Sequence, residues 1–228
     1  MERRDHDGAV TAFAEYIGQL PPKEQELYDD ISLVAQPHEA RAYQSTTPET
    51  RAAYLRDFWR RKDPFKTTGG AMRKAEHYRR VWHARSFFGE REWPWDKRGD
   101  VYIRYGEPDY RSSSREVKAQ VPLEVQRVQE VMAHQLYGNE AISMSFVGPV
   151  YPIRNTRSVG ETSRYSDQNL SKSFTESFDE SNVGLEFYKP ITASSDFSAH
   201  PWEVWIYTDV DGGLEIAFTD EFYSGRYG

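Results

Sequence analysis

The stretch that decides the expected fold is residues 93–111, WPWDKRGDVYIRYGEPDYR. Within it, Val101–Tyr105 alternates so that its first, third and fifth side chains would fall on one face of an extended segment. The Gly106–Asp109 turn should then end the strand, because its glycine tolerates unusual dihedrals and its proline has no N–H for a β-ladder. The stretch therefore predicts a short strand closed by a turn.

Upstream of this stretch, the first ninety residues carry helical signals. Apolar residues at helical spacing predict a pair of helices within Asp7–Ala35, and Gln36-Pro37 should end the second one. Thr47-Pro48-Glu49 predicts the start of another helix, since it offers a cap residue, a proline in the first turn and an acidic residue. A last helix is expected from Met72 to Phe88, with Gly89 as a left-handed cap.

Downstream, the pattern changes to strands. The candidate strands are Val101–Tyr105, Ala141–Val147, Gly184–Tyr188, Trp202–Tyr207 and Leu214–Phe218. Asp211-Gly212-Gly213 predicts a tight hairpin turn between the last two. Residues 123–136 predict a helix that begins after Pro122, and the polar stretch Asn155–Ser181 predicts a long loop.

These elements predict an α+β fold, with an N-terminal helical layer packed on a mainly antiparallel β-sheet. We expect a helical region at residues 1–90 and a β-rich region at residues 91–228 that contains an inserted helix and the polar loop. The two regions are expected to form one structural unit.

Composition excludes several classes of protein. The 36 acidic residues outnumber the 29 basic ones, which argues against a general nucleic-acid-binding protein, although a local basic patch stays open. The chain has no cysteine, so disulfides and thiolate chemistry are excluded. No run of 18 apolar residues predicts a membrane span. The amino end lacks the apolar stretch of a signal peptide, so the chain is expected to be either cytoplasmic or a form whose leader has been removed.

Several motifs in order resemble the GWxTD domain, a bacterial family without a settled activity, whose signature runs into an RGxVYIxYGxPD segment. Besides residues 98–109, the resemblance includes Phe58–Pro64, which is similar to FWxxRDP, and the arginine-rich stretch Glu76–Gly89. Near the end, Trp202–Tyr207 is similar to a YEIWxY strand, and Ile216–Asp220 to an FxFxD strand. The similarity covers roughly residues 21–227 and implies a bacterial cell-envelope or periplasmic protein, as part of a larger assembly.

The signature itself departs from the family pattern. The Gly-Trp-x-Thr-Asp motif is replaced by Glu92–Asp96, which keeps the tryptophan and the aspartate, and Lys97 is one extra residue before Arg98-Gly99. The turn that the missing glycine and threonine would build must therefore be made in another way.

Catalytic and metal-binding motifs are weak. Among the six histidines only His77 and His83 share a short segment, and a spacing of six places them on different faces of a helix, so neither a metal nor another cofactor is expected. A triad of His200 with Asp196 and a serine at 194, 195 or 198 is a remote alternative. Paired carboxylates beside aromatic residues keep open a carbohydrate-binding protein or a glycoside hydrolase that uses an aromatic cleft; the candidates are Glu107, Asp109, Glu203 and Asp220.

Arginine, aspartate and aromatic residues concentrate around the signature. Arginine binds carboxylates bidentately and stacks on aromatic rings, so these residue types support one another in a structural clasp or in an interaction surface. We expect a non-catalytic protein-interaction or structural module with a protein partner and no nucleic acid. The residues expected in the clasp or surface are Trp93, Trp95, Asp96, Arg98, Arg104, Tyr105, Asp109 and Arg111.

Overall fold

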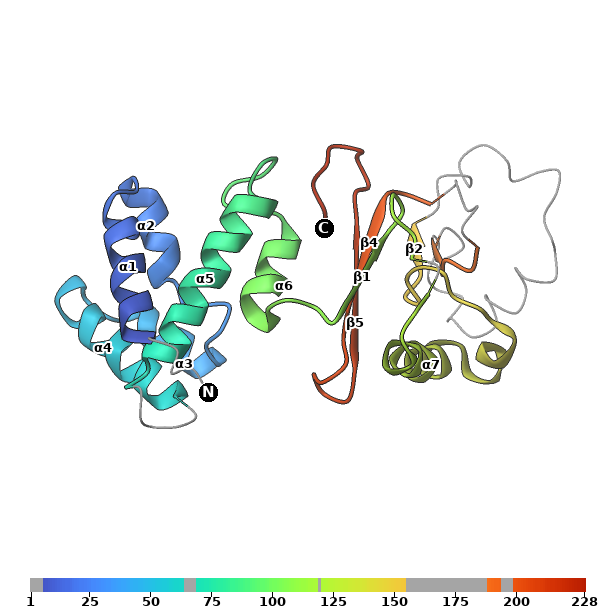
Figure 1. The fold of residues 1–228 in the computed structure, drawn as a ribbon, viewed down its shortest axis with the longest axis horizontal. Helices are drawn as coiled ribbons and strands as arrows, with labels where there is room; N and C mark the ends of the chain where they lie inside the picture. Colours follow the sequence, from blue (N-terminus) through green and yellow to red (C-terminus); the bar gives the residue numbers. More distant parts are fainter. Residues whose placement is uncertain (1–5, 64–68, 119, 155–187, 194–198) are drawn as a thin grey trace. The chain divides into compact units, whose positions relative to one another are not determined.

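The fold was determined as a computed structural model that describes residues 6–63, 69–118, 120–154, 188–193 and 199–228 (Figure 1). The chain divides into two compact units, Met1–Gly106 and Glu107–Gly228, which are described separately below. The first consists of helices, and the second combines strands with helical segments. The predicted α+β class is therefore confirmed.

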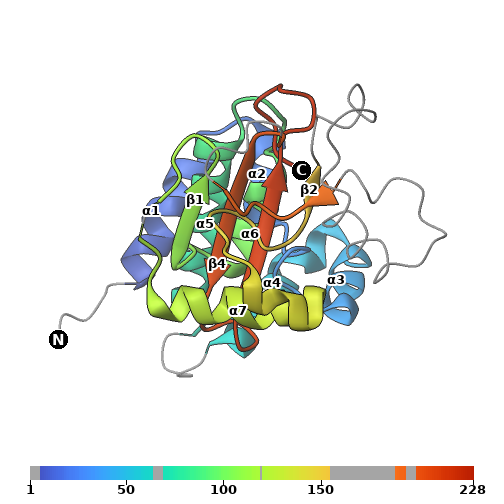
Figure 2. The same ribbon diagram turned by 90° about the vertical axis from the view of Figure 1, so that its right-hand side faces the viewer.

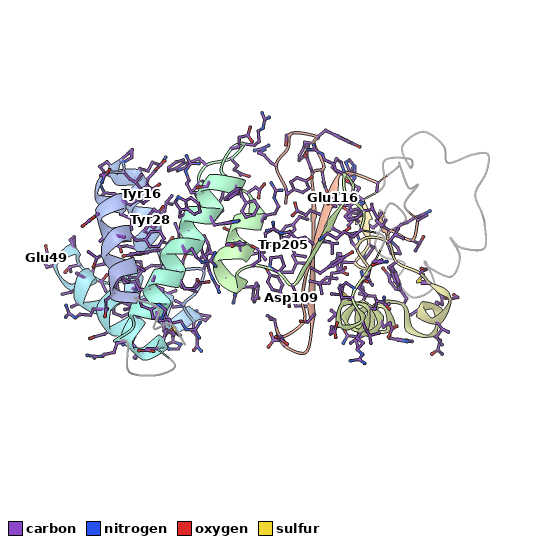
Figure 3. The ribbon with its side chains drawn as sticks, viewed as in Figure 1. Tyr16, Tyr28, Glu49, Asp109, Glu116 and Trp205 are labelled. Carbon is purple, nitrogen blue, oxygen red and sulfur yellow. The ribbon has the colours of Figure 1, made fainter. Side chains whose placement is uncertain are left out.

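The first unit is organised around one long helix. Helix α5 (Ala71–Phe88) contacts α1 (His6–Gly18), α2 (Pro22–Asp29), α4 (Pro48–Lys62) and α6 (Lys97–Tyr105). Aromatic rings fill the contacts between these helices: Tyr28 meets both Tyr16 and Tyr78 edge-on, and Figure 3 labels Tyr16 and Tyr28 on α1 and α2.

Proline marks the start of three helices in this unit. Thr47 precedes α4 as predicted, and its N–H donates to the hydroxyl of Thr50 at 3.1 Å. The prediction that the second helix continues to Gln36-Pro37 was wrong, because α2 ends at Asp29 and a new helix, α3 (Pro37–Gln44), begins at Pro37. The N–H of Gln36 donates to the carboxylate of Glu39 at 2.9 Å and so caps this helix, in which proline suits the first position.

The predicted strand Val101–Tyr105 was wrong, since these residues form the second half of α6. The buried side of the segment comprises Gly99, Tyr102 and Ile103, which is the i, i+3, i+4 spacing of a helix rather than alternation. Gly106 ends this helix instead of a strand. Its N–H donates to the carbonyl of Tyr102 at 2.8 Å, and its φ of 90° suits glycine alone.

The second unit contains two small antiparallel sheets. One has the strand order β1 (Tyr110–Ser113), β4 (Trp202–Tyr207), β5 (Leu214–Thr219), and the other pairs β2 (Ile153–Arg154) with β3 (Tyr188–Lys189). The two longest strands agree with the predicted ones. Helix α7 (Leu123–Tyr137) follows Pro122 as expected and continues into a 3₁₀ helix, Gly138–Ser143.

Helix α7 runs across the strands of the three-stranded sheet (Figure 2). Val125 and Val128 of the helix belong to the same apolar cluster as Val204 and Ile206 of β4. Because strand side chains alternate, Trp205 points to the opposite face of the sheet, where its ring meets Phe218 edge-on at 4.9 Å. Figure 3 labels Trp205 on β4, and the side chain is fully buried.

Two further sequence-based expectations failed, and the expected hairpin turn was confirmed. Ala141–Val147 is not a strand, because Ala133, Tyr137 and Ala141 continue one buried helical stripe at intervals of four residues into the 3₁₀ helix. Gly89 has a φ of −96° and is not a left-handed cap. The Asp211–Gly213 hairpin turn is confirmed, with positive φ at all three residues.

Some predicted features fall outside the described residues. The polar loop Asn155–Ser181 does so entirely, and of the predicted strand Gly184–Tyr188 only Tyr188 is described, as the first residue of β3. In the described part of the chain, no helix combines the length and the hydropathy that crossing a bilayer requires.

Candidate functional site

Asp96 and Arg98 form an ion pair at the start of α6. The Asp96 carboxylate accepts the backbone N–H of Arg98 at 3.1 Å and its guanidinium at 2.7 Å. Asp96 is only 2% exposed, and its own N–H donates to the carbonyl of Phe88 at 3.0 Å. The Arg98 guanidinium also lies over the Phe88 ring, 5.0 Å from its centroid. The pair therefore ties the end of α5 to the beginning of α6.

Trp95 is fixed against the first turn of α6. Its indole N–H donates to Asp100 at 2.9 Å, and Lys97 donates to the other oxygen of the same carboxylate at 2.9 Å. The indole ring lies directly against Gly99, where any Cβ would collide with it. The glycine of the Arg98-Gly99 pair is therefore required by the close approach of Trp95.

Trp93 is held from α2 and α5 but remains accessible. The Lys23 ammonium lies 4.9 Å from its ring centroid and the Arg85 guanidinium 4.5 Å. Arg85 is itself anchored, because it donates to Glu24 at 3.3 Å and to the carbonyl of Gly89 at 3.1 Å. The indole is 41% exposed, so it presents a fixed aromatic surface to solvent.

A cavity of about 320 Å³, which we call the signature cavity, lies beside these residues within the first unit. Trp93, Pro94 and Trp95 line it together with apolar residues of α2 and α5 and of the turn after α2. Among the described residues that line it, four carry a carboxylate and one carries an ammonium group. The acidic residues are Asp30, Glu92, Asp96 and Asp100, and the basic residue is Lys97. The cavity therefore combines aromatic walls with an excess of negative charge.

Arg104 and Tyr105, at the end of α6, contact each other. The Arg104 guanidinium lies 5.7 Å from the Tyr105 ring centroid, and the Arg104 carbonyl accepts the guanidinium of Arg80 at 3.1 Å. Among the described residues, no carboxylate lies within ion-pair distance of the Arg104 guanidinium.

Asp109 and Arg111 belong to the second unit and have their own partners there. The Asp109 carboxylate accepts the N–H and the hydroxyl of Thr208 at 2.7 and 2.8 Å. Arg111, on β1, lies 4.4 Å from the Trp205 ring centroid and 3.9 Å from Glu203. These contacts join β1 to β4 and to the segment after it.

Among the carboxylates considered for glycoside hydrolysis, Asp109, Glu203 and Asp220 accept hydrogen bonds from neighbouring groups, whereas Glu107 is exposed. Glu203 accepts the indole N–H of Trp205 at 2.6 Å. Asp220 accepts the N–H groups of Ser224 and Gly225 at 2.9 and 2.7 Å; burial raises its pKa, but these hydrogen bonds outweigh burial and lower it overall. Such contacts are typical of structural carboxylates in turns and strands.

The histidines have structural surroundings. His77 is buried against Trp59 and lies 3.2 Å from the carbonyl of Tyr28, and burial lowers its pKa to about 4. His83 stacks on Tyr102 with ring centroids 3.9 Å apart. Within the described ranges, no group of three or more potential metal ligands comes together. The serines and the aspartate of the alternative triad lie outside those ranges.

Two carboxylates were missed by sequence reasoning. The Lys97–Asp100 spacing of three residues could have identified Asp100 as a first-turn partner once a helix was assumed. Glu215 is buried on the α7 side of the sheet and accepts the N–H groups of Val150 and Tyr151 at 2.8 and 3.1 Å. Burial raises its pKa to about 7 despite these bonds, and nothing in the pattern of β5 distinguishes it from a surface glutamate.

Comparison with known proteins gave no relatives: no protein-family model matches the chain, and neither curated proteins nor solved structures yield a match. The resemblance to the GWxTD domain therefore rests on the motifs in the sequence.

Proposed function

We propose that this chain is a non-catalytic protein-interaction module that docks a partner at the signature cavity. The observation that carries the proposal is the fixed but accessible Trp93 indole, which Lys23 and Arg85 contact and which lines a cavity of about 320 Å³. Tryptophan is the residue type most enriched among energetically dominant interface residues. An anchor that is already held in place loses little conformational entropy on binding.

The charge around the cavity favours a partner segment that carries a basic side chain next to an apolar one. The apolar side chain would pack on Trp93 and Pro94, and the basic one would approach the exposed carboxylates Asp30 and Glu92. Such complementarity contributes mainly to specificity and to the association rate.

On the basis of the resemblance to the GWxTD domain, the proposal places this module in the bacterial cell envelope, as part of a larger multi-protein assembly. In this setting Asp96 and Arg98 act as the clasp that fixes the docking surface, because both side chains are largely buried and bonded to each other.

The test compares two tryptophans of equal exposure in the same unit. Trp93 is 41% exposed and lines the cavity, whereas Trp82 is 40% exposed and does not line it. Tagged wild type, Trp93→Ala and Trp82→Ala are used for capture under mild detergent from a lysate of the source organism, and each captured protein is then purified and titrated directly. We expect a partner whose affinity falls at least about tenfold for Trp93→Ala and less than about threefold for Trp82→Ala.

Equal effects of the two substitutions would contradict docking at the signature cavity. If folded wild type captures no partner above background, the interaction-module proposal fails, and screening with glycans becomes the next step for the carbohydrate-binding alternative.

A further inference from the structure

A second cavity in the first unit, of about 230 Å³, is surrounded by cationic side chains. They come from three helices: Lys62 of α4, Arg73 and Arg80 of α5, and Arg104 of α6. This convergence is unusual for its context, because acidic residues outnumber basic ones in the chain as a whole. We call it the basic cavity.

Of the described residues, Glu76 is the one carboxylate that lines the basic cavity, and its charge is already neutralised. Glu76 accepts the guanidinium groups of Arg79 at 2.9 Å and of Arg80 at 2.7 Å. Burial raises the pKa of Glu76, but these hydrogen bonds outweigh burial and lower it to about 2. Arg80 is further fixed by donation to the carbonyls of Ile103 and Arg104 at 3.2 and 3.1 Å. Arg80 therefore acts as a rigid brace between α5 and α6.

The remaining cationic side chains form fewer contacts with carboxylates of the described chain. Lys62 forms an ion pair with Glu39 at 2.8 Å. For Arg73 and Arg104, no carboxylate of the described chain lies within ion-pair distance, and both side chains are exposed at the rim. Guanidinium groups bind the oxygens of phosphates and carboxylates through paired N–H donors, so two such groups at one rim favour an anionic ligand.

The residues that line the basic cavity also indicate which other groups a bound anion would carry. Trp59 and Val34 supply apolar surface, with the fully buried Phe58 beside them, and His77 lines the cavity with its Nδ1 buried and without a hydrogen-bond partner in the described structure. His77 is neutral at physiological pH, and donation from its Nε2 to the carbonyl of Tyr28 leaves Nδ1 as an acceptor. An acceptor at this position favours an anion that itself carries an O–H group.

We propose that the basic cavity binds a small phosphate monoester with an apolar substituent. Arg73 and Arg104 would bind the phosphate oxygens, with Lys62 contributing charge. The substituent would pack against Trp59 and Val34. The hydroxyl of the monoprotonated phosphate, whose second pKa is about 6, would donate to Nδ1 of His77 once a small movement of the ring uncovers this buried atom. The full chain contains no phosphate-binding loop motif, so this site would be assembled by helix packing alone.

The experiment uses phenyl phosphate as the probe, with benzoate and inorganic phosphate as comparison ligands. Titrations at pH 6 are followed by two-dimensional NMR of the amides and of the Trp and His side chains. We expect saturable shifts centred on Trp59, His77 and Ile103. Phenyl phosphate should bind more tightly than either comparison ligand, because benzoate has no O–H to donate and inorganic phosphate has no apolar group.

The matched variants separate this site from general charge effects. The double variant Arg73→Gln/Arg104→Gln should weaken phenyl phosphate binding by at least about tenfold, since two charge-assisted contacts are lost. Arg60→Gln removes an exposed charge on α4 that pairs with Asp57 outside the cavity, and it should leave binding unchanged. The amide spectrum of each variant reports whether it is folded.

Three results would overturn the proposal: no saturable shifts with phenyl phosphate, equal affinity for benzoate, or equal effects of the double variant and Arg60→Gln. Among the described residues, the two cavities share only Ile103 in their linings. Failure of the phosphate-binding proposal would therefore leave the partner-docking proposal standing.

Discussion

Val101–Tyr105 in the first unit and Trp202–Tyr207 in the second have nearly the same alternating pattern of aromatic and aliphatic residues, yet the former is helical and the latter is a strand. The difference lies in their flanks. The helix begins at the Asp96 cap and ends at Gly106, whereas the strand has hydrogen-bonded neighbours on both sides, β1 and β5. Capping and available strand partners thus outweigh β-propensity in short segments.

The largest expected effect tests the strand side of this comparison. Trp205→Ala removes a fully buried ring of β4 that packs on Phe218 and on Arg111, so we expect a loss of about 3–5 kcal/mol in the free energy of unfolding. Chemical denaturation measures this loss. Phe222→Ala serves as the control, because Phe222 is 81% exposed and its removal should change stability by less than about 0.5 kcal/mol. Comparable losses in both variants would mean that β4 is not a core strand.

A second prediction concerns the pH response of the two units. Burial raises the pKa of Glu215 from 4.5 to about 7, so the unfolded chain releases this proton first, and stability falls as pH rises from about 4.5 through 7. Burial lowers the pKa of His77 from 6.5 to about 4, so its contribution has the opposite sign: stability is lost as pH falls from about 6.5 through 4.

Glu215→Gln isolates the first of these contributions. Relative to the variant, wild type should lose up to about 3 kcal/mol of unfolding free energy between pH 4.5 and 8. Denaturation midpoints across this range, for wild type and variant in the same buffers, give the difference curve. A flat difference curve would show that Glu215 titrates normally in the folded protein.

The cap of α6 is the next most sensitive feature. Asp96→Ala removes the acceptor for the Arg98 N–H and leaves a largely buried guanidinium without this carboxylate, with an expected loss of about 2 kcal/mol. Asp96→Asn keeps an acceptor for the N–H and should lose roughly half as much. If both variants were as stable as wild type in thermal and chemical denaturation, the clasp would have no structural role.

The smallest effect compares the two glycines that end helices. Gly106 after α6 and Gly138 after α7 both have positive φ, but a Cβ would meet the Arg80 guanidinium at 2.8 Å only at Gly106. Gly138→Ala should cost about 1 kcal/mol from backbone strain, and Gly106→Ala slightly more, since Arg80 must also shift. A smaller loss for Gly106→Ala, measured under identical conditions, would contradict the brace assigned to Arg80.

The elements with local signals were the ones that could be predicted from the sequence. Helix α4 follows its Thr47-Pro48 start, and β4 and β5 flank a turn that glycine makes recognisable. Helix α6 was missed because five alternating residues were weighed without the cap that precedes them. The 3₁₀ helix after α7 was missed because its burial depends on residues later in the chain. Ala141 continues the buried stripe of α7 and packs in one apolar cluster with Val150, a contact that the local sequence does not reveal.

The candidate sites were less predictable than the fold. Local spacing groups Trp93, Trp95 and Asp96, and these do line one cavity. By contrast, the basic cavity combines α4, α5 and α6, and its Arg73 and Arg104 are 31 residues apart, so only tertiary packing reveals it.

The most direct test of this account is the backbone conformation of the signature segment, because the cap, the close approach of Trp95 to Gly99 and the signature cavity all depend on α6 being a helix. Backbone ¹³Cα chemical shifts should lie above random-coil values throughout Lys97–Tyr105 and below them throughout Trp202–Tyr207. Shifts below random-coil values across Val101–Tyr105 would contradict the account, since the segment would then be extended, as its alternating pattern alone suggests.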